Sequence, residues 1–244
     1  MRDDFGFPAY MPVAERLRRG RAALARILEP KGRAPDPAVL TAGRGIARTF
    51  WGRAWCQNLE RYSDFASRLP RGRAYAKNGS VLDLAIEPGR VVAHVAGHEL
   101  YRVDVDIARL AARRWKALVA ACAGRIASVV ALLQGTLSDD VLALLTDAER
   151  GLFPEPDEIS LACSCPDWAG LCKHIAASLY AVGARLDDRP ELLFLLRRVE
   201  KDDLLAVTPA VKRSDRPQAK TIAAKDLSAV FGIELETRRR GKKR

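Results

Sequence analysis

Apolar residues recur at helical spacing near the start of the chain, in residues 12–29. The stripe consists of Val13, Leu17, Leu24, Ile27 and Leu28. Arginines fill many of the positions between them, so the pattern predicts an amphipathic helix with one strongly basic face. Residues 30–37 contain a glycine and three prolines, which predict a linker after this helix.

A second apolar stripe predicts a helix over about residues 46–68. Its members at helical spacing are Trp51, Trp55, Leu59 and Tyr62. Aromatic side chains can stack on nucleic-acid bases, but a stripe of this kind is typical of a buried helix face. We therefore interpret these residues as part of the core.

The middle of the chain alternates short apolar runs with turns. Residues 81–86, 91–95 and 101–105 are separated by glycine-containing turns and predict a small antiparallel meander. We expect this sheet to hold the preceding basic segment, 71–77, in order. Helical patterns resume at 107–133 and at 138–150, where Ser138 is a plausible cap.

The end of the chain predicts one more helix and then a polar region. Arg189-Pro190 introduces a helix at Glu191–Glu200, which we expect to cap the preceding module. Residues 208–220 are polar, contain two prolines and predict a link, and 225–235 form a short apolar segment. The last seven residues hold six bases, and this tail is expected to attract phosphate.

Charge is unevenly distributed in this chain of 244 residues, whose formal net charge is +11. Residues 44–78 carry eight basic and two acidic side chains, whereas residues 138–160 carry seven acids and one arginine. The excess positive charge raises the expectation of a polyanionic partner, nucleic acid before membrane. Apolar residues make up 48% of the chain, so we expect a globular protein.

Three of the five cysteines and one of the three histidines fall within twelve residues. They are Cys163, Cys165, Cys172 and His174. Three thiolates and one imidazole complete the tetrahedral coordination that zinc prefers in closed structural sites, so no position is left for chemistry. A disulfide or a chance cluster of buried thiols fits this paired spacing less well.

The spacing also predicts the local structure of this metal site. Cys163 and Cys165 at the end of a strand would project from one face, and Pro166 would end that strand. Cys172 and His174 begin a segment that predicts a helix ending at Gly183. A cysteine in the first turn gains from the positive end of the helix dipole, which favours its thiolate.

The remaining cysteines and histidines are interpreted without a metal. Cys56 and Cys122 lie in helical apolar patterns and are expected to be buried small side chains. His94 and His98 could join a second metal site, but no cluster of carboxylates or cysteines flanks them. We expect ordinary satisfied or surface histidines at both positions.

The Cys-x-Cys and Cys-x-His pairs resemble the SWIM-type zinc finger, in the variants Cys-Ser-Cys-Pro-Asp-Trp and Cys-Lys-His-x-Ala-Ala of bacterial members. The resemblance extends over roughly residues 44 to 235. It includes Trp51-Gly-Arg-Ala-Trp55, Arg71-Gly-Arg-Ala-Tyr75, Val81-Leu-Asp-Leu and Phe231-Gly-Ile-Glu-Leu. The family implies zinc binding with nucleic-acid or protein interaction, and bacterial members are often companions of Swi/Snf-type helicases.

These observations predict an α+β fold with a helical N-terminal region, a small antiparallel sheet, further helices and a zinc-bound SWIM finger. We divide the chain into four segments. They are a basic helix and linker at 1–37, a helix with sheet and helices at 38–150, the finger with following helices at 151–203, and a link, apolar segment and basic tail at 204–244.

The sequence contains no phosphate loop, nucleophile elbow or zinc-protease motif, so we expect no enzyme and no small-molecule substrate. The leading hypothesis is a zinc-stabilised protein that binds nucleic acid, DNA before RNA, through phosphate contacts. Candidate contacts are Arg71, Arg73, Lys77, Lys173, Arg238, Arg239, Arg240, Lys242, Lys243 and Arg244. The alternative is a module that contacts only proteins, such as an acidic partner or a helicase-like ATPase.

We expect a cytoplasmic location. The first residues, Met-Arg-Asp-Asp-Phe-Gly, lack the apolar core of a secretory signal. The most apolar region, Trp115 to Leu133, is interrupted by Arg125 and is too short to cross a bilayer. We therefore expect no membrane partner.

Overall fold

Four antiparallel strands form a single sheet in the order β1-β2-β3-β4. This computed structural model describes residues 11–38, 45–61, 68–167 and 169–206. The strands are β1 (Val81–Glu87), β2 (Arg90–Ala96), β3 (Leu100–Ile107) and β4 (Ile159–Cys163). The first three confirm the predicted meander. The fourth returns from about fifty residues further along the chain and pairs with β3, with Val103 opposite Cys163.

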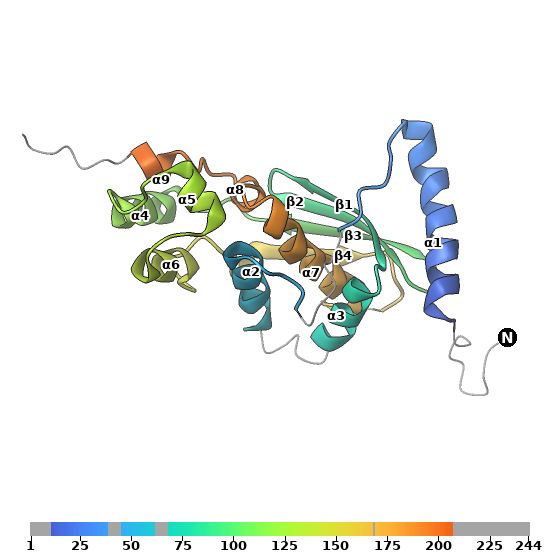
Figure 1. Cartoon of the computed structure of the whole chain (residues 1–244). Coiled ribbons are helices and arrows are strands. Elements are labelled where there is room, and N and C mark those ends of the chain that lie inside the picture. Colours follow the sequence, from blue (N-terminus) through green and yellow to red (C-terminus); the bar gives the residue numbers. More distant parts are fainter. Residues whose placement is uncertain (1–10, 39–44, 62–67, 168, 207–244) are drawn as a thin grey trace, which may run out of the picture. The chain divides into compact units, whose positions relative to one another are not determined.

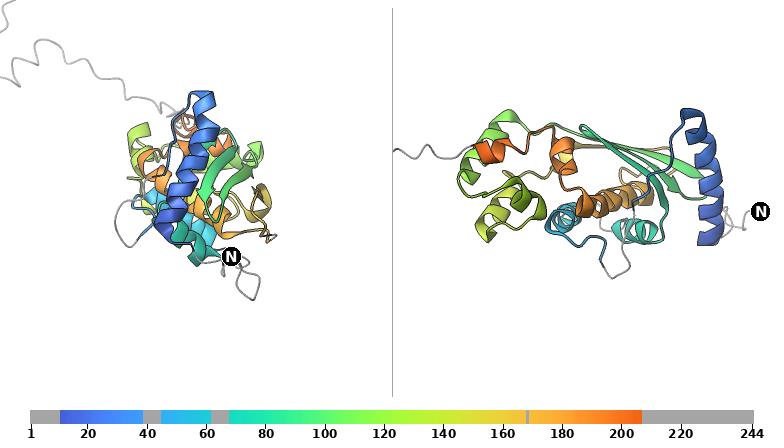
Figure 2. Two further views of the ribbon diagram at one scale, coloured as in Figure 1. Left: turned by 90° about the vertical axis from the view of Figure 1, so that its right-hand side faces the viewer. Right: turned by 45° about the horizontal axis from the view of Figure 1, so that its top comes forward.

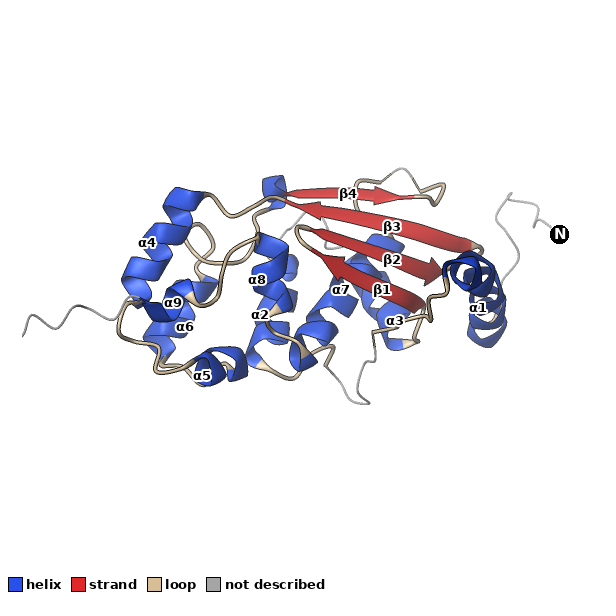
Figure 3. Cartoon of the chain, turned by 90° about the horizontal axis from the view of Figure 1, so that it is seen from above, coloured by secondary structure: helices blue, strands red, loops and turns tan. Residues whose placement is uncertain are grey.

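One face of the sheet is apolar because alternate residues of each strand point to the same side. Val91, Ala93 and Val95 of β2 are fully buried, as are Val103 and Val105 of β3. Helix α7 (Lys173–Asp188) covers this face, and α2 (Phe50–Glu60) and α3 (Leu69–Lys77) pack against α7 (Figures 1 and 3). The finger helix is therefore also the central helix of the core.

The aromatic stripe of α2 is buried, as predicted. Trp51 and Trp55 are at most 1% exposed. Each indole N–H donates to a backbone carbonyl, at 2.9 Å to Leu132 and at 2.8 Å to Leu179. These bonds satisfy the polar atom of each ring in the core, so both tryptophans are structural.

Glycines let the three helices approach closely. A Cβ on Gly52 of α2 would clash with the carbonyl of Gly183, and a Cβ on Gly72 of α3 would clash with Ala176 of α7. The prediction that Gly183 ends the finger helix is therefore wrong. Gly183 lies inside α7, where its missing side chain makes room for α2.

The basic segment at 71–77 also differs from expectation. It belongs to helix α3, which has a proline in its first turn, rather than to a segment ordered by the sheet. The predicted helix at 46–68 is correspondingly shorter, since α2 begins after Thr49 and ends at Glu60.

Short helices gather beyond one end of the sheet (Figure 1). They are α4 (Ala112–Cys122), α5 (Val129–Gln134), α6 (Asp139–Thr146), η3 (Pro156–Glu158), α8 (Leu192–Arg197) and α9 (Asp203–Ala206). The prediction of helix over 107–133 is wrong at Ile107, which ends β3, and at Gly124, which has a φ of 70° and separates α4 from α5. Ser138 occupies the N-cap position of α6, but its side chain makes no capping hydrogen bond.

Helix α1 (Val13–Leu28), followed by the short turn η1 (Glu29–Lys31), crosses the other end of the sheet (Figure 2). It confirms the predicted basic amphipathic helix. Its apolar side forms a small cluster of its own with the sheet, consisting of Leu24, Leu28, Leu82 and Ala96. This cluster is separate from the main core, so α1 depends on few apolar contacts.

None of the described helices is long and apolar enough to cross a lipid bilayer. The predicted link at 208–220, the apolar segment at 225–235 and the basic tail, which includes Arg238, Arg239, Arg240, Lys242, Lys243 and Arg244, lie outside the described residues. Tyr62 and Trp168 lie outside them as well.

Candidate metal centre and its surroundings

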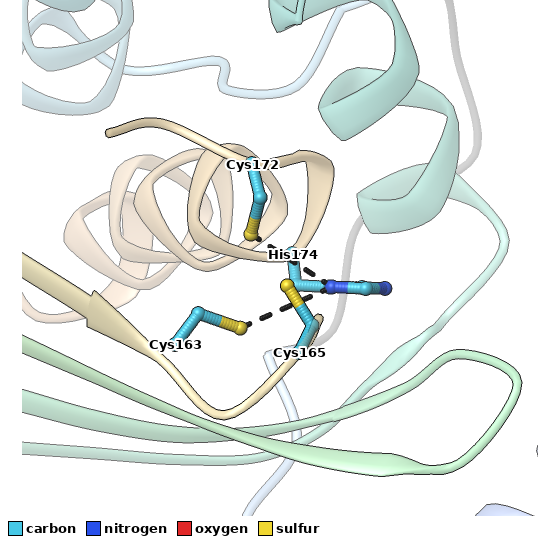
Figure 4. A group of neighbouring side chains, drawn as sticks. All are labelled: Cys163, Cys165, Cys172 and His174. Carbon is cyan, nitrogen blue, oxygen red and sulfur yellow. Dashed lines mark hydrogen bonds between the residues drawn. The ribbon is translucent and has the colours of Figure 1, made fainter. Parts of the chain in front are cut away.

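The end of β4 and the start of α7 bring the four predicted ligands together (Figure 4). Cys163 is the last residue of β4, Cys165 follows in the loop, and Cys172 is the N-cap of α7 with His174 in its first turn. Their ligand atoms all lie within 4.8 Å of one another. The strand ends three residues before Pro166, because the chain already turns at the first ligand.

The spacing of the donor atoms suits zinc. Nδ1 of His174 lies 3.8 Å from Sγ of Cys172 and 4.0 Å from Sγ of Cys163. A tetrahedral zinc ion with ordinary bond lengths needs sulfur and nitrogen about 3.6 Å apart, and two sulfurs about 3.8 Å apart. Three sulfurs and one imidazole nitrogen supply four ligands, so a bound zinc would have a closed coordination shell.

The helix start favours one thiolate. Sγ of Cys172 accepts a hydrogen bond from the backbone N–H of Ile175 at 3.5 Å. The pKa of Cys172 is lowered to about 3, first by its interaction with Cys163 and further by His174 and this N–H, although burial opposes the shift. The pKa of Cys163 is raised, first by its interaction with Cys172 and further by burial. Zinc would therefore displace a proton from Cys163 when it binds.

The histidine presents one nitrogen to the sulfurs and buries the other. Nε2 of His174 has no hydrogen-bond partner among the described residues. It faces Gly97, where a Cβ would lie only 2.8 Å from it. The imidazole also lies against the rings of Tyr101 and Tyr75, with centroids 4.5 and 5.5 Å away. The ring is thus held in place with Nδ1 toward the metal position.

Tyr75 connects this centre to two cations. The guanidinium of Arg16 on α1 lies 4.2 Å from the Tyr75 ring centroid, and Nζ of Lys173 lies 5.4 Å from it. Both distances are within the range of cation–π attraction. Lys173, predicted as a solvated or phosphate-facing residue, is half-buried beside the ring.

The other predicted nucleic-acid contacts on α3 differ in their surroundings. Arg71 is exposed and forms no ion pair within the described residues. Arg73 pairs with Glu60, whose carboxylate also accepts a hydrogen bond from the hydroxyl of Tyr180 at 2.9 Å. Lys77 is exposed. Part of the charge at 71–77 is therefore balanced by Glu60.

Two cations outside the predicted set of contacts are more available. Arg53 of α2 and Arg61, which directly follows that helix, are exposed and form no ion pair in the part of the chain that the structure describes. They lie eight residues apart, beside the buried tryptophan stripe. Their position relative to that stripe is the signal that could have identified them, since arginines next to a buried stripe must face solvent.

The remaining cysteines and histidines lie apart from the metal centre. Cys122 is fully buried, as expected, whereas Cys56 is half-buried and packs against Gly183. Nδ1 of His94 lies 3.1 Å from a carboxylate oxygen of the buried Asp83. His98 is exposed.

Comparison with known protein families agrees with this geometry. The model of the SWIM zinc finger matches residues 147–183, which include all four ligands. The chain contains a SWIM zinc finger. Its metal site is the Cys163, Cys165, Cys172 and His174 cluster, and zinc is its cofactor. The division of the chain into four segments stays a prediction.

A curated relative extends the similarity beyond the finger. The uncharacterized protein Rv2102 of Mycobacterium tuberculosis is 34% identical over 170 residues. The match covers 68% of this chain and 61% of the relative. The chain thus spans less than two thirds of that protein's length. No solved structure matches significantly.

Proposed function

We propose that this SWIM protein binds nucleic acid, DNA before RNA, through phosphate contacts on the outer side of α2 and α3. The observation that carries the proposal is the trio Arg53, Arg61 and Arg71, exposed cations without ion pairs among the described residues. Unpaired arginines bind phosphate without first breaking an internal ion pair. Zinc supports this surface from within, because both helices pack on the finger helix α7.

The opposite side of the sheet is less suited to phosphate. Its cations Arg90 and Arg102 both contact Asp104, at 2.5 and 2.8 Å. Asp106 and Glu87 are exposed nearby. Positive charge there is balanced by acids, so the contrast between the two sides favours the helices as the phosphate-binding side.

A matched pair of charge reversals tests the proposal. Changing Arg53, Arg61 and Arg71 to Glu should abolish retention of duplex DNA at low salt and leave zinc content unchanged. The control changes Arg109, Arg113 and Lys116 to Glu, exposed cations beyond the end of the sheet, and so alters net charge equally. Native DNA affinity should fall linearly in log salt, as counterion release requires. Equal loss in both variants would overturn the assignment to α2 and α3.

A contact with proteins alone is the second candidate. Leu195 on α8 is 36% exposed and lines a cavity of about 600 Å³ with Leu192 and Phe194. An exposed apolar hollow favours a protein partner, for which a Swi/Snf-type helicase is the candidate implied by the family resemblance. A pull-down from the native host with and without nuclease separates the two, since a partner bound through nucleic acid is released by nuclease.

A further inference from the structure

A cleft of about 330 Å³ lies between α2 and the segment that follows α6. One wall is a stripe of α2 side chains, Phe50, Arg53, Gln57 and Arg61. The other wall includes Thr146 and Phe153. The α2 stripe lies beside the buried tryptophans, so the wall is backed by the main core and keeps its shape.

The charge of the cleft sets it apart from the other hollows. Its lining contains two guanidinium groups and no carboxylate. By contrast, the hollow between α4 and α6 includes Asp147 and Glu149, and the one along α8 includes Glu191 and Glu200. Arg53 and Arg61 stand about 12 Å apart along the helix axis, so they bracket the cleft. The arrangement suits one anionic group held between two forked donors.

The wall also offers an aromatic surface. The ring of Phe50 is half-buried, and its centroid lies 5.0 Å from the ring of Trp51. Gly135 fixes it from one side, since a Cβ there would lie 2.8 Å from Cβ of Phe50. A fixed ring beside two cations can stack a base while the cations hold its phosphate. Gln57 adds an amide that can donate to and accept from a base edge.

We propose that this cleft binds one nucleoside monophosphate unit, either free or as one residue of a single strand, with Phe50 against the base and Arg53 and Arg61 on the phosphate. The volume lies at the lower limit for ligand cavities, which suits one nucleotide rather than several. The inference rests on the proposed nucleic-acid function and gives it a specific site.

The experiment titrates the full chain with adenosine 5′-monophosphate, adenosine, inorganic phosphate and a ten-residue oligothymidine by calorimetry. The double change Arg53→Gln and Arg61→Gln should lower the affinity for the monophosphate about tenfold or more. The control Arg113→Gln removes one exposed cation from α4, outside the cleft, and should leave monophosphate affinity unchanged. Phe50→Leu keeps the packing on Gly135. It should lower the affinity for the monophosphate about tenfold and leave the affinity for inorganic phosphate unchanged.

The outcomes separate the site from the function. Oligothymidine binding with no monophosphate binding at millimolar concentration overturns the cleft and leaves the proposed function standing. Monophosphate binding that depends on Arg53 and Arg61, without oligothymidine or duplex binding, supports the cleft as a site for free nucleotide and overturns the proposed function. If the double change leaves monophosphate binding intact, the assignment of the site to this cleft is wrong, whether or not the oligonucleotide binds.

Discussion

Two polar clusters hold separate elements of this chain together, and they use different chemistry. At one end of the core, β4 and α7 meet at the zinc ligands, whose donors lie within twelve residues of sequence. At the other end, the side chain of Arg197 is fully buried and donates to both oxygens of Glu158, at 2.8 and 2.9 Å, and to the carbonyl of Ala108 at 2.9 Å. Only the first cluster requires an ion from solution.

The arginine cluster supplies its own counter-charges. Arg114 donates to Glu155 at 2.8 Å and to the carbonyls of Gly151 and Phe153. The charges are thus balanced between protein groups, whereas three sulfurs and an imidazole converge on a position that needs a cation. Loss of zinc should therefore affect the finger and leave the arginine cluster intact, and each cluster can be broken without the other.

Breaking the metal centre should have the largest effect. Cys172→Ala or His174→Ala should remove zinc and lower the free energy of unfolding by about 5 kcal/mol or more, since structural zinc contributes about 10–16 kcal/mol in zinc-finger peptides. Elemental analysis and chemical denaturation measure the two effects. Cys56→Ala is the control and should keep one zinc per chain. Metal loss in that control would show that the ligand set is wrong.

Breaking the arginine cluster comes next. Arg197→Ala leaves Glu158 short of a partner in the interior and should cost about 3–5 kcal/mol of unfolding free energy, as is usual when one member of a buried pair is removed. Zinc content should stay at one equivalent. The control Arg189→Ala removes an exposed arginine whose pair with Glu191 spans 3.6 Å, and should change stability by less than about 0.5 kcal/mol. Equal effects would mean that Arg197 is not the central group.

The pH dependence sharpens the same contrast. Burial by itself would raise the pKa of Glu158, but hydrogen bonds from Arg197 and the Glu155 N–H, with the charge of Arg114, lower it below its ordinary value of 4.5. Its contribution to stability is therefore present above pH 4.5 and is lost as pH falls through the lower folded-state pKa. Glu158→Gln should flatten this part of the stability curve, measured as the difference from the native protein. An unchanged acid slope would contradict the account.

The smallest expected effect concerns α1. Arg16 donates to the hydroxyl of Ser80 at 2.9 Å and covers the ring of Tyr75. Arg16→Ala should weaken docking of α1 by about 1–2 kcal/mol. Amide hydrogen exchange in α1 should speed up about tenfold while zinc content stays the same. Arg26→Ala, an exposed change on the same helix, should not alter exchange, and faster exchange in both would point to the loss of a positive charge instead of the loss of docking.

The two clusters also show what the sequence could reveal. The zinc ligands and the meander are local patterns, so spacing alone predicted them. The arginine cluster is assembled from Ala108, Glu158 and Arg197, which lie far apart in the chain and carry no periodic signal. The pairing of β4 with β3 was missed for the same reason, because five residues of alternation do not identify a partner strand.

Tertiary contacts also decided which cations are available. Arg71 and Arg73 look alike in sequence, yet Glu60 from another helix pairs with Arg73, whereas Arg71 forms no ion pair with the described residues. Gly183 was predicted to end a helix, but it lies inside α7, where a glycine is needed because α2 approaches closely. Both cases depend on a neighbour that is contributed by a distant segment.

X-ray absorption at the zinc edge can show whether the finger is a closed site with three thiolates and one imidazole. We expect three sulfur ligands at about 2.3 Å and one nitrogen at about 2.0 Å in the native protein, with no bound water. Fewer than three sulfurs, or an added oxygen that marks an open position, would contradict this expectation.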